Sequence, residues 1–552
     1  PHSLSYPGKT MYQLVRDAAL RFPEHIAYDF MGTTSTYRTL LEDIDHTATA
    51  LTGRGLQKGD AVTVCLPNCP QALIFFYALN KIGAVASMIH PLSAPAEIEF
   101  YLKESGSVWA VTLNAFYKNF LPVLERTGVR TVVLAKIDDY LSPVKRAFFY
   151  LASGRKIKAP DPADPRVLWW RELLAEAPDG TAAPVDTTLS PDDPAVILYS
   201  GGTTGVPKGI LLSSKNFNAL GLQTATQGPI ESTDVILSIL PVFHGFGLGV
   251  CVHTFLIAGG KCVLVPRFTA ESVAALITKE KPQYMAGVPT LYEALLREKR
   301  MKNADLSCFK TAYAGGDKLP RSVKERFDTL IRNHGGTAEL LEGYGLTESV
   351  TACIVTPKGH YRPGSVGIPL PDMLAKIVAP GTMEESPPGT DGELCVAGPT
   401  LMLGYLNSPQ ETKSTLRTHP DGITWLHTGD SCSMDEDGFV YFKLRIKRIV
   451  KVSGVSVSPV RVEEVLDAHP DVSLSCVIGI PDKYKLQTLK AFVVLSDPDA
   501  ASPEKERALI NYCKEHLITW SVPERIVFRD NLPLTLVGKV AYRELENEEA
   551  GN

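Results

Sequence analysis

Apolar runs alternate with helix-like periodic segments over most of the first 440 residues. The apolar run at residues 61–65 precedes a helix-like segment at 70–79, and the run at 109–112 precedes one at 114–124. This alternation is typical of an α/β fold with largely parallel sheets. We therefore predict a large N-terminal region of α/β subdomains with layered sheets.

Another pattern follows toward the C-terminus. Residues 460–468 have the periodicity of a helix, and residues 475–480 and 491–495 have the composition of strands. A chain of 552 residues also exceeds what one hydrophobic core usually supports. Two or more domains are therefore expected.

Residues 137–191 differ from the rest because they contain seven prolines, which predicts an excursion over the surface. Within it, residues 144–158 hold five basic residues, no acidic residue and a central aromatic cluster. A helix lying on an anionic lipid surface has this composition, and so has a solvated basic patch whose aromatic rings pack on the protein. Weak, reversible membrane contact is the hypothesis that follows from the first interpretation.

Composition narrows the function classes. Hydrophobic residues make up 44% and charged residues 21%, as in globular proteins, and the net charge of −5 gives no reason to invoke nucleic acid. No apolar stretch reaches the roughly 20 residues that span a bilayer, and no signal peptide is visible. The ten cysteines are scattered, which favours neither a disulfide framework nor a cysteine metal site. Free thiols predict a reducing, cytoplasmic location.

A glycine-rich segment at residues 199–209 reads Tyr-Ser-Gly-Gly-Thr-Thr-Gly-Val-Pro-Lys-Gly and lies between apolar runs at 195–198 and 210–212. Glycine lets the backbone approach a bulky anion, while hydroxyls, amides and an ammonium donate to phosphate oxygens. It is not a Walker A loop, because no Gly-Lys-Ser/Thr follows at the required spacing. The segment predicts a phosphate-binding loop, against the alternative of an ordinary glycine-rich hairpin.

Three further parts of the sequence indicate a function only when they are considered together. Residues 343–349 place Glu348 after a hydroxyl on a glycine-flanked turn, which suits Mg²⁺ beside a phosphate but also suits a helix cap. Residues 428–430, Thr-Gly-Asp, could be an ordinary turn, yet a carboxylate with two acceptor oxygens suits a vicinal diol. Lys539 would by itself be read as a solvated surface lysine.

In order along the chain, these segments resemble the signature motifs of the adenylate-forming superfamily, which includes acyl-CoA synthetases, peptide-synthetase adenylation domains and beetle luciferases. The segment 199–209 fits the family pattern at every position, and Gly201, where many members carry Ser, resembles the fatty-acyl-CoA ligase branch. Residues 314–317, 343–349, 428–430 and 533–539 resemble the motifs that follow. The resemblance extends from about Thr10 to Lys539.

The resemblance implies roles for individual residues. Tyr344 would stack on adenine, Thr347 would contact the α-phosphate and Glu348 would hold Mg²⁺. Asp430 would accept hydrogen bonds from both ribose hydroxyls. The residues implied in binding ATP or coenzyme A are Ser200, Gly201, Gly202, Thr203, Thr204, Gly205, Lys208, Gly315, Gly316, Asp317, Tyr344, Gly345, Thr347, Asp430, Arg445, Lys451 and Gly454, and those implied in catalysis are Lys539, Glu348, Thr203, Lys208 and His244.

Two segments depart from the family pattern. In the hinge, Leu444 replaces Gly or Asp and Arg448 replaces an acid, on either side of Lys447, about which the small domain would swing. Near the C-terminus, Val537 stands where Ser is usual before the catalytic Lys539. By resemblance the domains are residues 1–446, which bind ATP and the acyl group, and residues 447–552, a small mobile α+β lid.

The implied reaction joins a carboxylic acid to coenzyme A in two steps with ATP and Mg²⁺. Members that act on amino acids usually carry an Asp near residue 244, where this chain has Phe243 and His244, so the acid is expected to lack an ammonium. We expect His244 to gate an acyl tunnel and the acid to be a medium- or long-chain fatty acid. The alternatives are an aryl acid, transfer to a carrier protein and a non-catalytic adenylate-binding relative.

Overall fold

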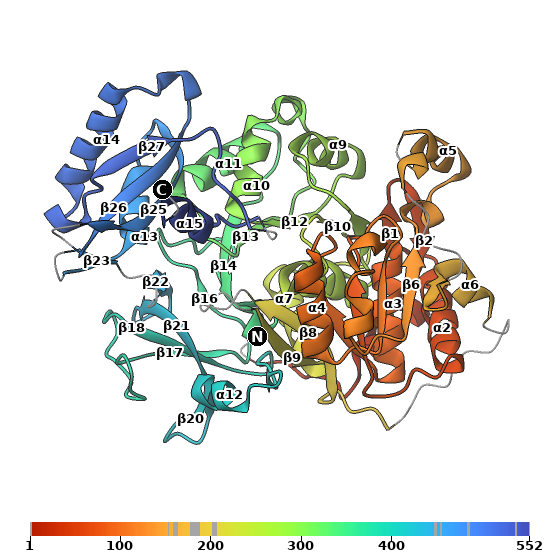
Figure 1. Ribbon diagram of the computed structural model, residues 1–552. Helices are drawn as coiled ribbons and strands as arrows, with labels where there is room; N and C mark the ends of the chain where they lie inside the picture. Colours follow the sequence, from red (N-terminus) through yellow and green to blue (C-terminus); the bar gives the residue numbers. More distant parts are fainter. Residues whose placement is uncertain are drawn as a thin grey trace.

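The computed structural model describes residues 3–152, 154–157, 164–176, 188–200, 207–445, 450–452, 455–482, 486–535 and 538–550. Within these ranges the strands form four sheets. Two large sheets and their helices make up the body of the molecule, a third sheet lies beside them, and the last sheet belongs to a smaller unit that ends the chain (Figure 1).

The first large sheet is parallel in its middle and antiparallel at both edges. In spatial order its strands are β16 (Ile368–Pro369), β15 (Ala352–Val355), β14 (Leu340–Gly345), β13 (Thr311–Gly315), β12 (Tyr284–Gly287), β10 (Val235–Ser238), β11 (Lys261–Leu264), β1 (Ile26–Phe30) and β2 (Thr33–Thr36).

The second large sheet is also mainly parallel, and β9 and β19 add an antiparallel edge. Its order is β19 (Gly404–Tyr405), β9 (Lys208–Ser213), β8 (Pro194–Ser200), β4 (Val85–Met88), β3 (Ala61–Cys65), β5 (Trp109–Leu113), β6 (Thr131–Ala135) and β7 (Val167–Trp169). The alternation of strands and helices in the sequence is thus confirmed as an α/β fold.

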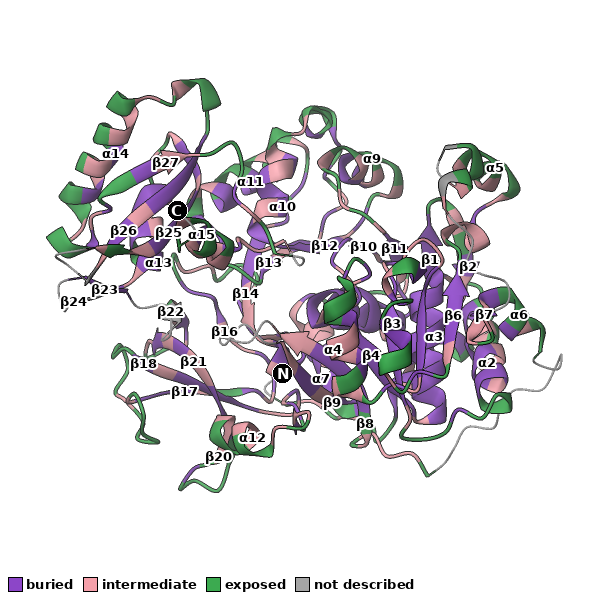
Figure 2. Cartoon of the chain, viewed as in Figure 1, coloured by how far each residue is buried: buried purple, intermediate pink, exposed green. Residues whose placement is uncertain are grey.

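Helices cover these sheets, and one of them is buried on every side. In α3 (Pro70–Ile82) all residues are buried, since the helix packs inside the main core (Figure 2). It begins with Pro70 in the first turn and ends at Gly83, whose φ of 76° is the left-handed cap geometry that favours glycine. The other helices of this region are α1 (Met11–Arg21), α2 (Tyr37–Gly53), α4 (Pro95–Ser105), α5 (Pro143–Ala152), α6 (Trp170–Ala175), α7 (Ser214–Gln227), α8 (Thr254–Ala258), α9 (Ala270–Glu280), α10 (Pro289–Arg297), α11 (Arg321–Asn333) and α12 (Pro409–Thr415).

Short helical turns join these elements, and one of them, η5 (Phe246–His253), is a π-helix. Short π-helical segments often occur at functional sites. The 3₁₀ turns are η1 (Tyr117–Asn119), η2 (Leu124–Arg126), η3 (Ile137–Tyr140), η4 (Gly154–Lys156), η6 (Lys299–Asn303), η7 (Thr347–Ser349), η9 (Pro498–Ala500) and η10 (Thr519–Ser521).

The third sheet is antiparallel and carries the segment 428–430. Its strands are β17 (Leu374–Val378), β18 (Gly392–Ala397), β20 (Leu416–Thr418), β21 (Thr424–Met434) and β22 (Val440–Arg445). Figure 1 shows it at the lower left, below the C-terminal unit.

The C-terminal unit has a core of its own. Its elements are β23 (Val450–Val452), β24 (Val455–Val457), α13 (Pro459–Asp467), β25 (Val472–Asp482), β26 (Leu486–Leu495), α14 (Pro503–His516), β27 (Arg525–Phe528) and α15 (Tyr542–Ala550). Buried side chains such as Val462, Leu489 and Leu509 form a cluster separate from the main core. We call this unit the lid. Its predicted boundary at residues 446 and 447 falls at the edge of segment 446–449, outside the described residues.

Two expectations from the sequence need correction. Residues 114–124 are not one helix: they contain η1 and the start of η2, because Pro122 has no N–H to donate and its ring obstructs a continuing helix. The region 137–191 is not wholly a surface excursion, since β7 pairs with β6 and Trp170 of α6 is buried. Among the described residues, no helix has both the length and the apolar character needed to cross a bilayer.

Candidate active site

A cavity of about 1340 Å³ lies where the carboxyl ends of several strands meet the lid. Ser200 ends β8, Gly315 ends β13 and Gly345 ends β14. Ligands of open α/β sheets bind at such carboxyl ends. The expected site residues that line the cavity are Ser200, Lys208, His244, Gly315, Gly316, Asp317, Tyr344, Gly345, Thr347, Glu348, Asp430 and Lys539.

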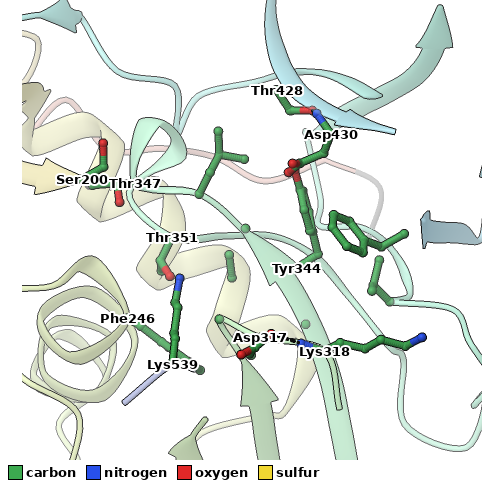
Figure 3. A pocket seen from close by; sticks show the side chains of 18 of the residues that line it. Ser200, Phe246, Asp317, Lys318, Tyr344, Thr347, Thr351, Thr428, Asp430 and Lys539 are labelled. Carbon is green, nitrogen blue, oxygen red and sulfur yellow. Dashed lines mark hydrogen bonds between the residues drawn. The ribbon is translucent and has the colours of Figure 1, made fainter. Parts of the chain in front are cut away.

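Tyr344 and Asp430 come from different sheets and meet in this cavity (Figure 3). The Tyr344 hydroxyl donates to Oδ2 of Asp430 over 2.7 Å. Burial, and next the Asp430 carboxylate, hold the pKa of Tyr344 well above its usual range. Tyr344 therefore stays protonated and fixes the orientation of the carboxylate.

The part of β21 that carries Asp430 is held in place by Thr428 and Glu393. The Thr428 hydroxyl accepts from the Asp430 N–H over 3.1 Å and donates to the Leu394 carbonyl over 2.8 Å. Glu393 accepts from the Gly429 N–H over 3.1 Å, and Gly429 has a φ of 71°. This part of β21 therefore holds a buried carboxylate in one orientation at the cavity wall.

Close backbone packing shapes the turn after β14. A Cβ atom on Gly345 would lie 1.6 Å from the Thr351 carbonyl oxygen, so only glycine fits there. Thr347, at the start of η7, is buried, and Val350 at its end has a φ of 64°, which is strained for a β-branched residue. Such strain is frequent at functional turns.

Glu348 is held by a tyrosine that the sequence motifs did not single out. The Tyr405 hydroxyl donates to Oε1 of Glu348 over 2.8 Å. Lys208 lies over the Tyr405 ring, 5.2 Å from its centroid, and forms an ion pair with Glu411. Tyr405 and Glu411 lie in no glycine-rich or charged motif, so only the fold brings them to Glu348 and Lys208.

Lys539 enters the cavity from the lid. Its loop is closed by hydrogen bonds within residues 535–539, and the Thr290 hydroxyl donates to the Gly538 carbonyl over 2.9 Å. Gly316 has a φ of 85°, and a Cβ atom there would lie 3.1 Å from Cε of Lys539. Figure 3 shows the Lys539 side chain reaching toward Thr351 and Phe246.

His244 stands at the start of the π-helix and is electrically neutral. Desolvation by burial, and next the positive charge of Lys539, lower the pKa of His244 to about 3. Its Nδ1 accepts from the Phe246 N–H over 3.1 Å, which places the ring proton on Nε2. His244 can therefore donate, but not provide a positive charge, at neutral pH.

Polar contacts join the lid to the body, and one of them, between Lys318 and Glu464, borders the cavity. Lys318 pairs with Glu464 of α13, and the Ser473 hydroxyl donates to Oε1 of Glu293 over 2.8 Å. Burial raises the pKa of Asp467 to about 8. The docked position of the lid is thus held by a few polar contacts.

Several expected site residues lie outside the described part of the chain. These are Gly201, Gly202, Thr203, Thr204, Gly205 and Gly454, together with Lys447, Arg448 and Val537. Arg445 pairs with Asp430 through the β21–β22 register, but its side chain, like that of Lys451, is outside the described set. Their roles stay predictions.

Comparisons with known proteins agree with this architecture. The pattern of the AMP-binding enzyme family matches residues 15–406, and the pattern of the AMP-binding enzyme C-terminal domain matches residues 461–539. The long-chain-fatty-acid–CoA ligase of Bacillus subtilis (strain 168) is 34% identical over 559 residues, covering 100% of this chain and 97% of that enzyme. The ligase of the same description from Salmonella typhimurium is 34% identical, covering 98% of this chain and 95% of that enzyme.

A solved structure gives the same fold. The crystal structure of ATP-bound MatB from Rhodopseudomonas palustris superposes with a TM-score of 0.84 at 25% identity, covering 98% of this chain and 99% of that one. The fold and cavity thus define an adenylate-forming enzyme with a large N-terminal and a smaller C-terminal domain. The chain belongs to the AMP-binding enzyme family, on its fatty-acyl-CoA ligase branch, as the motifs indicated.

Proposed function

We propose that this acyl-CoA synthetase joins a medium- or long-chain fatty acid to coenzyme A at the expense of ATP, and that the described cavity is its adenylation site. The observation that carries the proposal is the position of Lys539. This lid lysine lies in one cavity with Tyr344 of β14, Glu348 of η7 and Asp430 of β21. The similarity to long-chain-fatty-acid–CoA ligases over the whole chain supports the substrate class.

In the first half-reaction a carboxylate oxygen of the acid attacks the α-phosphorus of ATP. The bond to the bridging oxygen breaks, pyrophosphate leaves and acyl-AMP forms. Two anions must approach each other, so an ammonium between them stabilises the transition state. Lys539 is assigned this role, with Thr347 at the α-phosphate and Asp430 on the ribose. His244, held neutral, adds no charge beside the acid.

Glu348 fits the role of magnesium ligand. Tyr405 donates to its Oε1, so Oε2 is the atom of Glu348 that would hold a Mg²⁺ ion. When bound, Mg²⁺ neutralises charge on the leaving pyrophosphate. Lys208 and the loop 201–205 are assigned to the pyrophosphate end of ATP, and the Lys208–Glu411 pair must open for this contact.

The second half-reaction requires the lid to move. The coenzyme A thiolate attacks the acyl carbonyl, the bond to the phosphate oxygen breaks and AMP leaves. We propose that the lid, residues 447–552, rotates about Lys447, withdraws Lys539 and presents Lys451 and Gly454 to coenzyme A. The Lys318–Glu464 ion pair supports this idea, because its side chains are 34% and 24% exposed and part-exposed ion pairs contribute little and separate easily.

The apolar wall near His244 favours an uncharged acyl chain. Phe243, Phe246 and Val250 line the cavity, the last two from the π-helix, and His244 lines it as well. A buried ammonium without a carboxylate partner would be costly, so an amino acid is disfavoured. We propose that His244 gates this acyl region.

Pyrophosphate release with a panel of acids, with and without coenzyme A, tests the function. We expect release with fatty acids and conversion to thioester only when coenzyme A is present. Release without thioester formation would indicate an acyl-AMP ligase that serves a carrier protein. Preference for benzoate-type acids would assign an aryl substrate, and no release with any acid would contradict catalysis.

We further propose that α5 makes weak, reversible contact with anionic membranes from the cytoplasmic side. Val144, Phe148 and Leu151, spaced along one face of the helix, are 67%, 69% and 57% exposed. The opposite face holds α5 to the body, since Lys145 donates to the Met31 carbonyl and Phe149 packs against the core. An outward apolar stripe among basic residues suits a lipid interface.

Co-sedimentation with vesicles tests this contact. We expect the protein to pellet with anionic vesicles at low salt and less so with neutral ones, and Phe148→Ser with Leu151→Ser to abolish pelleting. Leu20→Ser is the matched control, because Leu20 is 60% exposed on α1. Absence of pelleting with anionic vesicles at low salt would overturn the proposal without touching the ligase activity.

A further inference from the structure

Three side chains with metal-binding atoms gather at the wall of the cavity, where His427 is part of the lining. Cys395 on β18 and His427 on β21 face each other as register partners, and His419 lies in the turn between β20 and β21. Their ligand atoms all lie within 4.8 Å of one another. All three residues are buried: Cys395 is 0% exposed, His419 is 3% exposed and His427 is 7% exposed. We call this group the Cys–His cluster.

The two imidazoles of the Cys–His cluster point at each other. The Nε2 atoms of His419 and His427 are 2.9 Å apart. Oε2 of Glu393 lies 2.9 Å from Nδ1 of His427, so the ring proton of His427 belongs on Nδ1 and its Nε2 carries a lone pair. This carboxylate–histidine contact is the arrangement that orients histidine ligands of zinc.

Hydrogen bonds within the described residues do not satisfy the Cys–His cluster. If His419 donates from Nε2 to His427, then Nδ1 of His419 is an acceptor, and this buried atom has no hydrogen-bond partner in the described part of the chain. Buried polar atoms are normally paired. Around Cys395 the surroundings of the cluster are apolar. Val378, Ala397 and Trp425 pack with Cys395 in a small hydrophobic core.

We propose that Cys395, His419 and His427 bind a divalent transition metal, Zn²⁺ in the first place, with Glu393 supporting His427 from outside. A thiolate and two imidazoles are ligands that zinc prefers, at about 2.3 Å and about 2.0–2.1 Å. Tetrahedral geometry places two such nitrogens about 3.3 Å apart. The 2.9 Å separation therefore has to widen by only a few tenths of an ångström.

Protons and charges balance for this site. On binding, the Cys395 thiol releases one proton to solvent, and His419 shifts its ring proton from Nε2 to Nδ1. The thiolate and the Glu393 carboxylate then offset the two positive charges of the metal. The nearby ammonium of Lys376 is already paired with Asp421 over 2.8 Å.

The site is distinct from the magnesium position proposed at Glu348. It lies in the third sheet, and Glu393 links it to the part of β21 that carries Asp430, because Glu393 contacts both Nδ1 of His427 and the Gly429 N–H. Such a metal has a structural role, since the cluster is buried and the ion would fasten β18 to β21. We therefore expect the metal to raise the melting temperature of the chain.

Cobalt substitution tests the proposal on the full-length protein. The chain is stripped with a chelator under reducing conditions and titrated with Co²⁺, then with Zn²⁺. We expect one equivalent of Co²⁺ with a thiolate-to-cobalt charge-transfer band, displaced by Zn²⁺. Cys395→Ser should remove the band, His419→Asn should weaken binding, and Glu393→Gln should lower the affinity about 10- to 100-fold.

Cys513→Ser is the matched control, since Cys513 is a buried free cysteine in the core of the lid. It should keep both the band and the affinity. Cobalt binding without a thiolate band, equal binding by Cys395→Ser, or no metal by elemental analysis at any added concentration would each show that the cluster is a hydrogen-bonded histidine pair only. If a variant fails to fold, the presence or absence of the thiolate-to-cobalt band in the wild-type protein still tests the proposal.

Discussion

The Tyr344 hydroxyl donates a 2.7 Å hydrogen bond to Oδ2 of Asp430, across the junction of two sheets. The motifs suggested that Tyr344 meets the base and Asp430 the sugar, but not that the two residues contact each other. One side chain thereby orients the other, so the nucleotide pocket is organised before ATP arrives. Pre-organised polar groups bind with less loss of entropy.

Tyr344→Phe should therefore raise the KM for ATP about 10-fold. It keeps the ring but removes a hydrogen bond to a charged group, which contributes about 1.5–3 kcal/mol. Steady-state kinetics with varied ATP measure this. Tyr441→Phe is the control, because Tyr441 donates to Asp435 over 3.0 Å outside the cavity lining. An unchanged KM in Tyr344→Phe would contradict the assigned role.

Lys539→Ala should lower the rate of acyl-AMP formation by at least about 100-fold, since removing one donor to a developing anion has effects of about 10²–10³. Pyrophosphate release measures the first half-reaction, and thioester formation from supplied acyl-AMP measures the second. We expect the second to persist. Lys514→Ala, at an exposed lysine of α14, is the control. Intact pyrophosphate release would refute the assignment of Lys539.

Tyr405→Phe should raise the Mg²⁺ concentration needed for half-maximal activity several-fold. The variant frees Oε1 of Glu348 from its 2.8 Å hydrogen bond, so the carboxylate can rotate away from the cation. Activity titrated with Mg²⁺ at saturating ATP tests this, again with Tyr441→Phe beside it. A changed maximal rate with an unchanged Mg²⁺ requirement would argue against Tyr405 as a positioning residue.

Gly345→Ala should destabilise the body of the protein by more than about 3 kcal/mol, as severe backbone overlap does. The added Cβ would lie 1.6 Å from the Thr351 carbonyl oxygen. Chemical denaturation measures the loss. Gly53→Ala, at the end of α2 with nothing within 4 Å of the new atom, should change stability little. Equal stability of the two variants would mean that the turn after β14 is pliable.

Asp467 should make the lid less stable as the pH rises. Burial raises its pKa from 3.8 to about 8, so the folded lid keeps a proton that the unfolded chain releases above pH 3.8. Stability then falls with pH between these two values and levels off above 8. In the wild type the Ser475 hydroxyl donates to Oδ1 of Asp467 over 2.7 Å. Asp467→Asn keeps an acceptor for this hydroxyl and removes the carboxyl group that titrates.

Thermal melts at pH 5, 7 and 9 test this prediction. The melting temperature of the wild type should fall by several degrees more than that of Asp467→Asn over this range. Asp499→Asn, at an exposed position, is the control and should follow the wild type. Parallel pH dependence in the wild type and Asp467→Asn would rule out Asp467 as the source.

Local patterns predicted much of the fold. The strands at 61–65 and 109–113 form where their apolar runs predicted them, because every residue of each strand is buried. The helix of the lid at 459–467 forms nearly where its periodicity predicted it, because one side of it is buried. The continuous helix predicted at 114–124 is absent for a local reason as well, because Pro122 interrupts a helix despite the helical periodicity. The burial of Trp170 instead depends on the pairing of β7 with β6, and the prolines on either side of β7 gave no indication of this pairing.

The sequence by itself determined the family and the chemical groups of the site, because glycines, hydroxyls and charged residues at fixed spacing are needed wherever this nucleotide chemistry occurs. Only the tertiary structure decided which groups touch: Tyr405 on Glu348, Glu411 on Lys208, Glu393 on His427, and Lys539 beside Gly316. These partners lie far apart in the chain or in unremarkable segments. Their pairing depends on how sheets and lid pack, which no short-range pattern specifies.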